Sequence, residues 1–231
     1  MYYHAAQKNF KAAKRGSKEI EKAEKGFARL RAKEKRILDK HSNEPLGAYN
    51  ELEPVYIQME GAEYDIAAAY GLQIQYLALV HILCAAAAEA HINQIAKEEL
   101  TGKFRDQFEK VSLEGKWLFL PKMLGGSSFD QRSEPFQSFS MLIKYRNALV
   151  HHKSKKENWE GFEQGPPKFL HTLGLSLQEA DRSVRSVRLM FIELSKIIKR
   201  KPPYWLRDGY DKLPTDITTN FFEIVLERSD A

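Results

Sequence analysis

Three residues in the second half of the chain carry the side chains that phosphodiester chemistry needs. Arg146, Asn147 and His151 lie within six positions of one another. A guanidinium group holds a phosphate bidentately and neutralises the charge that builds on it during cleavage. An imidazole transfers a proton near neutral pH. Because RNA supplies its own nucleophile, the 2′-hydroxyl, this set predicts RNA cleavage without a metal ion and without a protein nucleophile.

The spacing of these residues limits how they can act together. On an ideal helix, two residues five positions apart differ in direction by about 140°, at about 100° per residue. One regular helix therefore does not direct Arg146 and His151 at the same phosphate. Either the helix distorts near residue 149, or the site is completed across a two-fold dimer.

The helix that carries the three residues is expected to begin just after Ser133. A serine is a preferred N-cap, and Pro135 fits the first turn. The helix is expected to run to about His151, and the polar, Gly- and Pro-containing residues 153–167 predict a loop. Its buried face is expected to follow a helical spacing that includes the arginine: Phe136, Phe139, Ile143, Arg146, Val150.

Helical patterns dominate the rest of the chain, and strand signals are few. Residues 41–60 contain Pro45, Gly47 and Pro54, so a connector is expected there, with a short extended piece around residues 55–57. The class is therefore all-α, a bundle of five to seven helices with a basic helix at its N-terminus. Further helices are predicted over residues 5–40 and 63–100, over residues 176–199 (where Ser176 and Glu179 form a capping box) and over residues 215–228.

The segment Arg146-Asn147-x-x-x-His151, late in a helix that follows a long helical hairpin, resembles the motif of the HEPN superfamily (higher eukaryotes and prokaryotes nucleotide-binding). The resemblance covers roughly residues 60–200. It implies a bundle of four or five helices, often dimeric, and in many members a metal-independent endoribonuclease. It also implies the roles of three residues: Arg146 as phosphate and transition-state ligand, Asn147 as the orienting polar group and His151 as the catalytic imidazole.

Polar residues elsewhere are candidates for supporting this site. Glu89 and Asn93 lie one turn apart on the long helix, and similar domains carry polar residues there that face the motif. Glu89 is expected to pair with Arg146, either within the site or as pure structure. His152 either assists or is simply exposed to solvent. No His-Glu-x-x-His, Cys-x-x-Cys or Gly-rich nucleotide loop occurs, so we expect no metal and no cofactor.

The basic charge of the chain is concentrated at its N-terminus. The 231 residues carry a net charge of +5, but residues 1–40 alone hold 13 Lys and Arg against 5 Asp and Glu. Two interpretations of this segment stay open: a solvated helix packed by one edge, or a basic arm that contacts RNA or a partner. The expected division is a basic helical arm (1–42), a HEPN-like bundle (60–200) and a C-terminal extension with a short helix (201–231).

One segment is long enough to be weighed as a membrane span. Ile66–Ala88 contains no formal charge, but Gln73, Gln75 and His81 interrupt it, which favours a buried core helix. The single cysteine, Cys84, is expected to be a small buried hydrophobe, and a reducing compartment fits. A signal peptide is not visible, so we expect a cytoplasmic protein without a membrane partner.

Three functions follow from these patterns as hypotheses. The first is a metal-independent endoribonuclease, a toxin or phage-defence effector, with RNA as substrate, a homodimer as its form and an antitoxin or regulatory protein as partner. The alternative is a non-catalytic HEPN-like module that binds RNA, nucleotide or a protein. The third is a structural or defence-assembly subunit whose basic arm supplies the contacts.

Overall fold

The computed structural model describes residues 1–42, 45–151 and 168–206 of the chain. These residues form helices and no strand, which confirms the predicted all-α class. The predicted loop at 153–167 and the predicted helix at 215–228 lie outside the described residues. In chain order the elements are α1 (Tyr2–Lys40), α2 (Pro45–Glu99), α3 (Gly102–Glu109), α4 (Leu113–Met123), α5 (Glu134–Val150), α6 (Lys168–Thr172), α7 (Leu177–Ile197) and the 3-10 helix η2 (Tyr204–Leu206).

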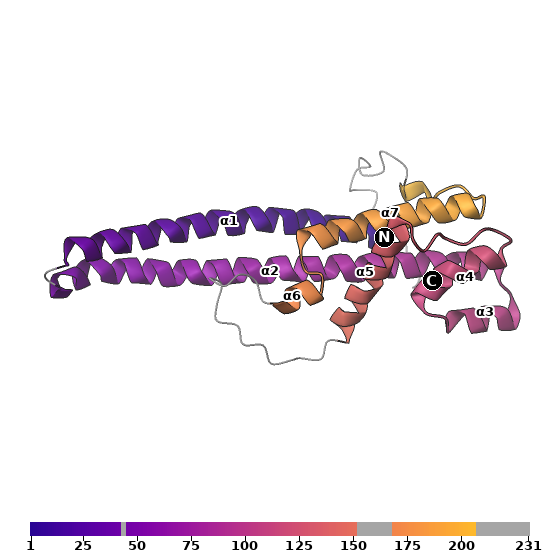
Figure 1. Cartoon of the computed structure of the whole chain (residues 1–231), viewed down its shortest axis with the longest axis horizontal. Coiled ribbons are helices and arrows are strands. Elements are labelled where there is room, and N and C mark those ends of the chain that lie inside the picture. The colour runs from indigo at the N-terminus through magenta and orange to yellow at the C-terminus, as the bar shows by residue number, and fades with distance from the viewer. Residues whose placement is uncertain (43–44, 152–167, 207–231) are drawn as a thin grey trace, which may run out of the picture.

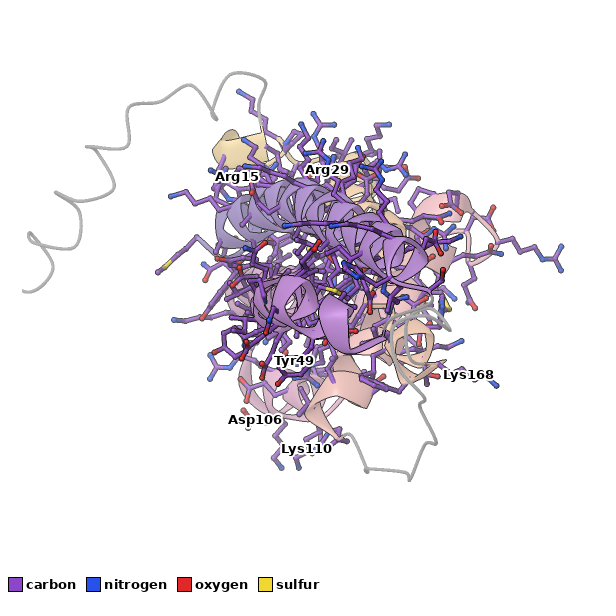
Figure 2. The ribbon with its side chains drawn as sticks, turned by 90° about the vertical axis from the view of Figure 1, so that its left-hand side faces the viewer. Arg15, Arg29, Tyr49, Asp106, Lys110 and Lys168 are labelled. Carbon is purple, nitrogen blue, oxygen red and sulfur yellow. The ribbon has the colours of Figure 1, made fainter. Side chains whose placement is uncertain are left out.

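The two longest helices, α1 and α2, lie antiparallel and side by side, and their joined end extends well beyond the other helices (Figure 1). α1 buries only one edge. Its Lys and Arg side chains are exposed, and Arg15 and Arg29, labelled in Figure 2, lie on the side away from α2. The expected basic segment is thus a helix packed by one edge. The buried edge is a row of apolar residues: Tyr3, Ala6, Phe10, Ala13, Ile20, Ile37.

The connector predicted for residues 41–60 is wrong, because α2 already begins at Pro45 and residues 55–57 are helical. Pro54 lies inside this helix, where its missing N–H removes one backbone hydrogen bond. Leu52 and Val55, on either side of Pro54, pack with Ile37 of α1. Near the joined end of the hairpin, one residue of α1 and three of α2 form a separate buried cluster: Ile37, Ala48, Leu52, Val55.

The main hydrophobic core lies toward the opposite end of the hairpin, where α4, α5 and α7 pack around the C-terminal half of α2 (Figure 1). Cys84 is fully buried in this core, as predicted, and burial raises the pKa of its thiol. The largest fully buried side chains come from all four helices: Ile92, Trp117, Leu120, Phe139, Phe191. Because α5 and α7 enclose this core, their positions depend on it directly.

The uncharged segment Ile66–Ala88 lies within α2 and was expected to be a buried core helix. By length and composition α2 is apolar enough to cross a membrane, and only 39% of its most apolar window is buried inside the protein. Leu77 and Val80 are buried, whereas Leu72 and Leu79 on other sides of the helix are exposed. The segment therefore contributes one side to the core and leaves another side open.

Candidate functional site

The helix α5 carries the Arg-Asn-x-x-x-His motif. It crosses α2, and its C-terminal end projects below the hairpin, near α6 (Figure 1). As predicted, Ser133 is its N-cap residue and Pro135 lies in its first turn. The Ser133 side chain makes no capping bond to the helix; its hydroxyl donates to the Asp130 carbonyl at 2.6 Å. Anchoring the N-terminal part of α5 in the core leaves its last turn at the surface.

The buried face of α5 differs from the predicted one at its C-terminal end. Phe136 and Phe139 are buried as expected, but Val150 is 51% exposed. Leu142 and Tyr145 are buried in its place. The reason is geometric: α5 crosses α2 at an angle, and its end projects beyond the hairpin. Ala148 and Leu149 still pack against the core, whereas Val150 is turned to solvent.

The three motif residues lie on this surface turn. Arg146 is half-buried, and its Nη1 donates a hydrogen bond to Oδ1 of Asn147 at 3.1 Å. His151 is exposed at the C-cap, where its backbone (φ −111°, ψ 25°) leaves the helical conformation and its N–H still reaches the Asn147 carbonyl at 2.9 Å. The structure thus pairs Arg146 with Asn147 and places His151 where the helix ends.

The guanidinium of Arg146 has no ion-pair partner among the residues that the structure describes. Glu89, the acid predicted to pair with Arg146, lies half-buried on α2, and the described structure shows no ion pair between the two residues. A guanidinium that pairs with no carboxylate of the described residues can bind an anion such as a phosphate.

The other two supporting candidates do not join the motif. Asn93 accepts a hydrogen bond on Oδ1 from Nζ of the buried Lys116 at 2.9 Å, and it lines a cavity of about 440 Å³ between α2 and α3 together with Lys97 and Arg105. His152 lies outside the described residues. The site that can be described therefore consists of Arg146, Asn147 and His151.

A polar contact with α7 holds the end of α5 in place. The hydroxyl of Tyr145, directly before Arg146, donates to Glu179 at 3.1 Å, and Arg182 binds the same carboxylate at 2.9 Å. Burial, followed by the negative charge of Glu179, raises the pKa of the Tyr145 hydroxyl. Glu179 also belongs to the predicted capping box. Its N–H donates to Ser176 Oγ, which confirms Ser176 as the N-cap, but the Ser176 N–H donates to the Gly174 carbonyl instead of the Glu179 side chain. Glu179 therefore connects the start of α7 to the end of α5.

A buried histidine supports Tyr145 from the other side. The ring of His81, on α2, lies 5.2 Å from the Tyr145 ring. Its Nδ1 contacts Ser183 Oγ at 3.0 Å, and its Nε2 contacts the Gly174 carbonyl at 2.8 Å. Burial lowers the pKa of His81, although the contacts with Gly174 and Glu179 oppose this effect. The neutral ring fixes α2, α5 and the turn before α7 relative to one another.

This supporting network was not predicted from the sequence. Glu179 carried the signal of a helix cap, and His81 counted only as a polar interruption of an apolar segment. The pairings join residues 34 to 102 positions apart, which no periodic pattern indicates. Comparisons of the chain with protein-family models, with curated proteins and with solved structures find no match.

Proposed function

We propose that the protein is a HEPN-type, metal-independent endoribonuclease that cleaves single-stranded or loop RNA. One observation carries this proposal: the guanidinium of Arg146 lies at an exposed helix end with an amide beside it, and the described residues offer it no carboxylate. An arginine kept for structure alone is normally paired with an acid when it is half-buried. This one pairs with Asn147 and keeps its charge.

The three residues have distinct tasks in the proposed reaction. The 2′-oxygen of a ribose attacks the adjacent phosphorus, a bond forms between them, and the bond from phosphorus to the 5′-oxygen breaks. Arg146 binds the phosphate oxygens as negative charge builds on them. His151 takes the proton of the 2′-hydroxyl or delivers one to the leaving 5′-oxygen. Asn147 orients the guanidinium. The products are a 2′,3′-cyclic phosphate and a 5′-hydroxyl.

The proposal extends to the setting of the enzyme. We place it in the cytoplasm as a homodimer, acting as a toxin or phage-defence effector under the control of an antitoxin or regulatory protein. On one regular helix the side chains of Arg146 and His151 point in directions about 140° apart, so a single copy does not direct both at one phosphate. A dimer would remove this obstacle. A second copy can bring its own motif to the same phosphate.

RNA incubation in EDTA tests the reaction. We expect wild-type protein to cut an end-labelled single-stranded RNA and to leave 2′,3′-cyclic phosphate ends. His151→Ala should reduce the rate by about 10²-fold or more, the size of a lost proton-transfer group. Arg146→Ala should reduce it by about 10²- to 10³-fold, the size of a lost oxyanion ligand. Both variants should melt at the wild-type temperature.

The matched control is His171→Ala, since His171 is an exposed histidine on α6, outside the motif. Its cleavage rate should equal that of the wild type. Cleavage that survives His151→Ala unchanged would contradict the proposal. RNA binding without any cleavage by the wild type would favour the non-catalytic binding module instead. A strongly lowered melting temperature for Arg146→Ala would assign the arginine to structure.

A further inference from the structure

The cavity of about 440 Å³ that Asn93 lines lies between α3 and the C-terminal end of α2, and we call it the α2–α3 cavity. α3 and α4 lie beside this end of α2 (Figure 1). Asn93 follows His81, the residue of α2 that contacts the Tyr145 ring, by 12 positions, which is about 18 Å along the helix. The cavity is therefore separate from the Arg-Asn-x-x-x-His motif.

Each of the two helices presents one face to the cavity. Asn93 and Lys97 lie one turn apart on α2, and Arg105, Phe108 and Glu109 follow the i, i+3, i+4 spacing on α3. Phe108 is buried, whereas the charged residues among the five are exposed. The cavity thus combines an apolar surface with a few polar groups, and its volume lies within the range of about 300–1,000 Å³ that is usual for ligand sites.

A buried lysine of α4 contacts two of the residues that line the cavity. Lys116 is only 4% exposed; its Nζ donates to Oδ1 of Asn93 at 2.9 Å and lies 5.9 Å from the centre of the Phe108 ring. In the part of the chain that the structure describes, Lys116 forms no ion pair. Burying an ammonium group without an acid costs free energy, so this position favours the arrival of a negative charge.

Lys116 also determines which atoms Asn93 offers to the cavity. Because an ammonium group only donates, Oδ1 of Asn93 must be the atom that faces it. The amide nitrogen Nδ2 is left with two N–H groups and makes no hydrogen bond to another described residue. Asn93 therefore offers hydrogen-bond donors to a ligand.

Lys97 and Arg105 add two cations, one from each helix. Neither forms an ion pair within residues 1–42, 45–151 and 168–206. The acids that follow Lys97 on α2 are bound by Arg200 instead: its Nη1 lies 2.7 Å from Glu98, and its Nη2 contacts Glu99.

The balance of charge around the cavity is positive. Among the described residues that line it, Glu109 is the only acid, and it lies one turn from Arg105 without pairing with it. Lys97, Arg105 and the adjoining Lys116 outnumber this carboxylate. With the Nδ2 donors of Asn93, the site offers mostly positive charge and N–H groups, which an anion satisfies.

We propose that the α2–α3 cavity binds a small organic monoanion, a carboxylate attached to an apolar body. Its carboxylate accepts hydrogen bonds from Arg105, Lys97 and Nδ2 of Asn93, and its apolar part covers Phe108. Glu109 selects against a phosphate dianion, which would bring a second negative charge close to an existing one. The proposal rests on the residues around this cavity and does not depend on RNA cleavage.

Titration with benzoate, followed by isothermal calorimetry or ligand-observed NMR, tests the proposal. Benzamide, a neutral molecule of the same shape, should bind at least about 10-fold more weakly than benzoate. Arg105→Gln should raise the Kd for benzoate about 10-fold or more, the size of a lost charge-assisted hydrogen bond. The matched control is Lys103→Gln, since Lys103 is exposed on α3 and does not line the cavity. This variant should keep the wild-type Kd.

Lys116→Met tests the contribution of the buried ammonium. Methionine fills a similar space without a charge, so we expect the variant to fold and to melt no lower than the wild type. Its Kd for benzoate should rise about 10-fold, because Asn93 loses the group that orients it. An unchanged Kd would contradict the role of Lys116. If this variant does not fold, Arg105→Gln and Lys103→Gln still decide the main proposal.

Four outcomes overturn the proposal: no benzoate binding up to about 10 mM, ten times a Kd of about 1 mM; equal binding of benzoate and benzamide; an unchanged Kd in Arg105→Gln; and inorganic phosphate that displaces benzoate and binds more tightly. The last result would assign the cavity to phosphate groups. RNA cleavage by wild type and His151→Ala is scored separately, so the failure of one proposal is distinguishable from the failure of the other.

Discussion

Three histidines of this protein lie in different surroundings, two of them packed inside the fold and one exposed at a helix end. His81 is held between α2, α5 and α7 by two polar contacts. His91 lies among Trp117, Phe191 and Trp205, and its Nε2 finds no hydrogen-bond partner in the described parts of the chain. His151 alone of the three is exposed. Of the three, only His151 lies where a substrate could reach it, which is why the proposed reaction assigns proton transfer to His151.

The buried histidines make stability depend on pH. Burial lowers the pKa of His91 to about 4, against an ordinary value of 6.5, and lowers the pKa of His81 as well. The unfolded chain then binds more protons than the folded chain between pH 6.5 and pH 4. The stabilisation is complete above pH 6.5 and is lost as the pH falls. For His91 alone, the loss at pH 5 amounts to about 2 kcal/mol.

Thermal melting at pH 7.5 and pH 5 measures this loss. The wild-type Tm should fall by several degrees, at about 2–4 °C per kcal/mol for a chain of this size. His91→Phe, which keeps an aromatic ring but removes the titration, should show a smaller fall. His171→Ala, an exposed control, should fall as much as the wild type. Equal falls for His91→Phe and the wild type would show that His91 is not the source.

At the scale of single helices, local signals in the sequence predicted the ends of elements well. Ser133 with Pro135 placed the start of α5, and the Ser176–Glu179 box placed the start of α7. Such signals succeed because caps and first turns depend on neighbours within four residues. Two predictions failed: the buried face of α5 at its C-terminal end, and the connector over residues 41–60, where α2 continues through Pro54. Both features depend on residues that are distant in the sequence.

The candidate site divides in the same way. The positions of Arg146, Asn147 and His151 within one turn of a helix end followed from their spacing and from the expected limit of that helix. The contacts of Tyr145 with His81 and Glu179, which hold that end, did not, since they join three helices. The candidate residues were chosen by type and spacing and stay a prediction, whereas the residues that hold their helix end are defined only by tertiary packing.

The turn between α6 and α7 gives an element-scale prediction. Gly174 has a φ of +67°, and a Cβ there would meet the Tyr145 ring at 2.6 Å. Gly174→Ala should therefore displace Tyr145 and with it the last turn of α5. We expect a loss of about 1–2 kcal/mol for the left-handed backbone and a further 1–3 kcal/mol for the clash. Thermal melting measures the total, and the RNA cleavage rate should fall as well.

Gly125→Ala separates the two contributions. Gly125 also has a positive φ, +77°, but an added Cβ would meet nothing within 4 Å. This variant should lose only the backbone contribution and should keep the full cleavage rate. If the two alanine variants melted together, the packing of Gly174 against Tyr145 would not contribute to stability.

At the scale of the whole molecule, positive charge and the motif lie on opposite sides of the hairpin. The basic side of α1, with Arg15 and Arg29, faces away from α2 (Figure 2), whereas the end of α5 projects on the other side of α2 (Figure 1). A short RNA bound at Arg146 therefore does not reach this basic side. A long RNA that wraps around the hairpin does, and phosphate contacts there would add affinity that depends on salt.

Reversing charges on α1 tests whether RNA contacts its basic side, and it does so better than deleting the helix. Deletion of residues 1–40 would expose Leu77 and Val80 of α2 to water. We expect Arg15→Glu with Arg29→Glu to leave the cleavage rate of a short oligonucleotide, about 8 nucleotides, unchanged. Lys144→Glu, beside the motif, should raise the KM for the same substrate several-fold. Both should weaken binding of a long RNA at low salt, with a reduced salt dependence. If the α1 variant lost cleavage of the short substrate, the basic side of α1 would belong to the active site. An active site confined to the surroundings of Arg146 would then be wrong, because the substrate would have to contact both sides of the hairpin.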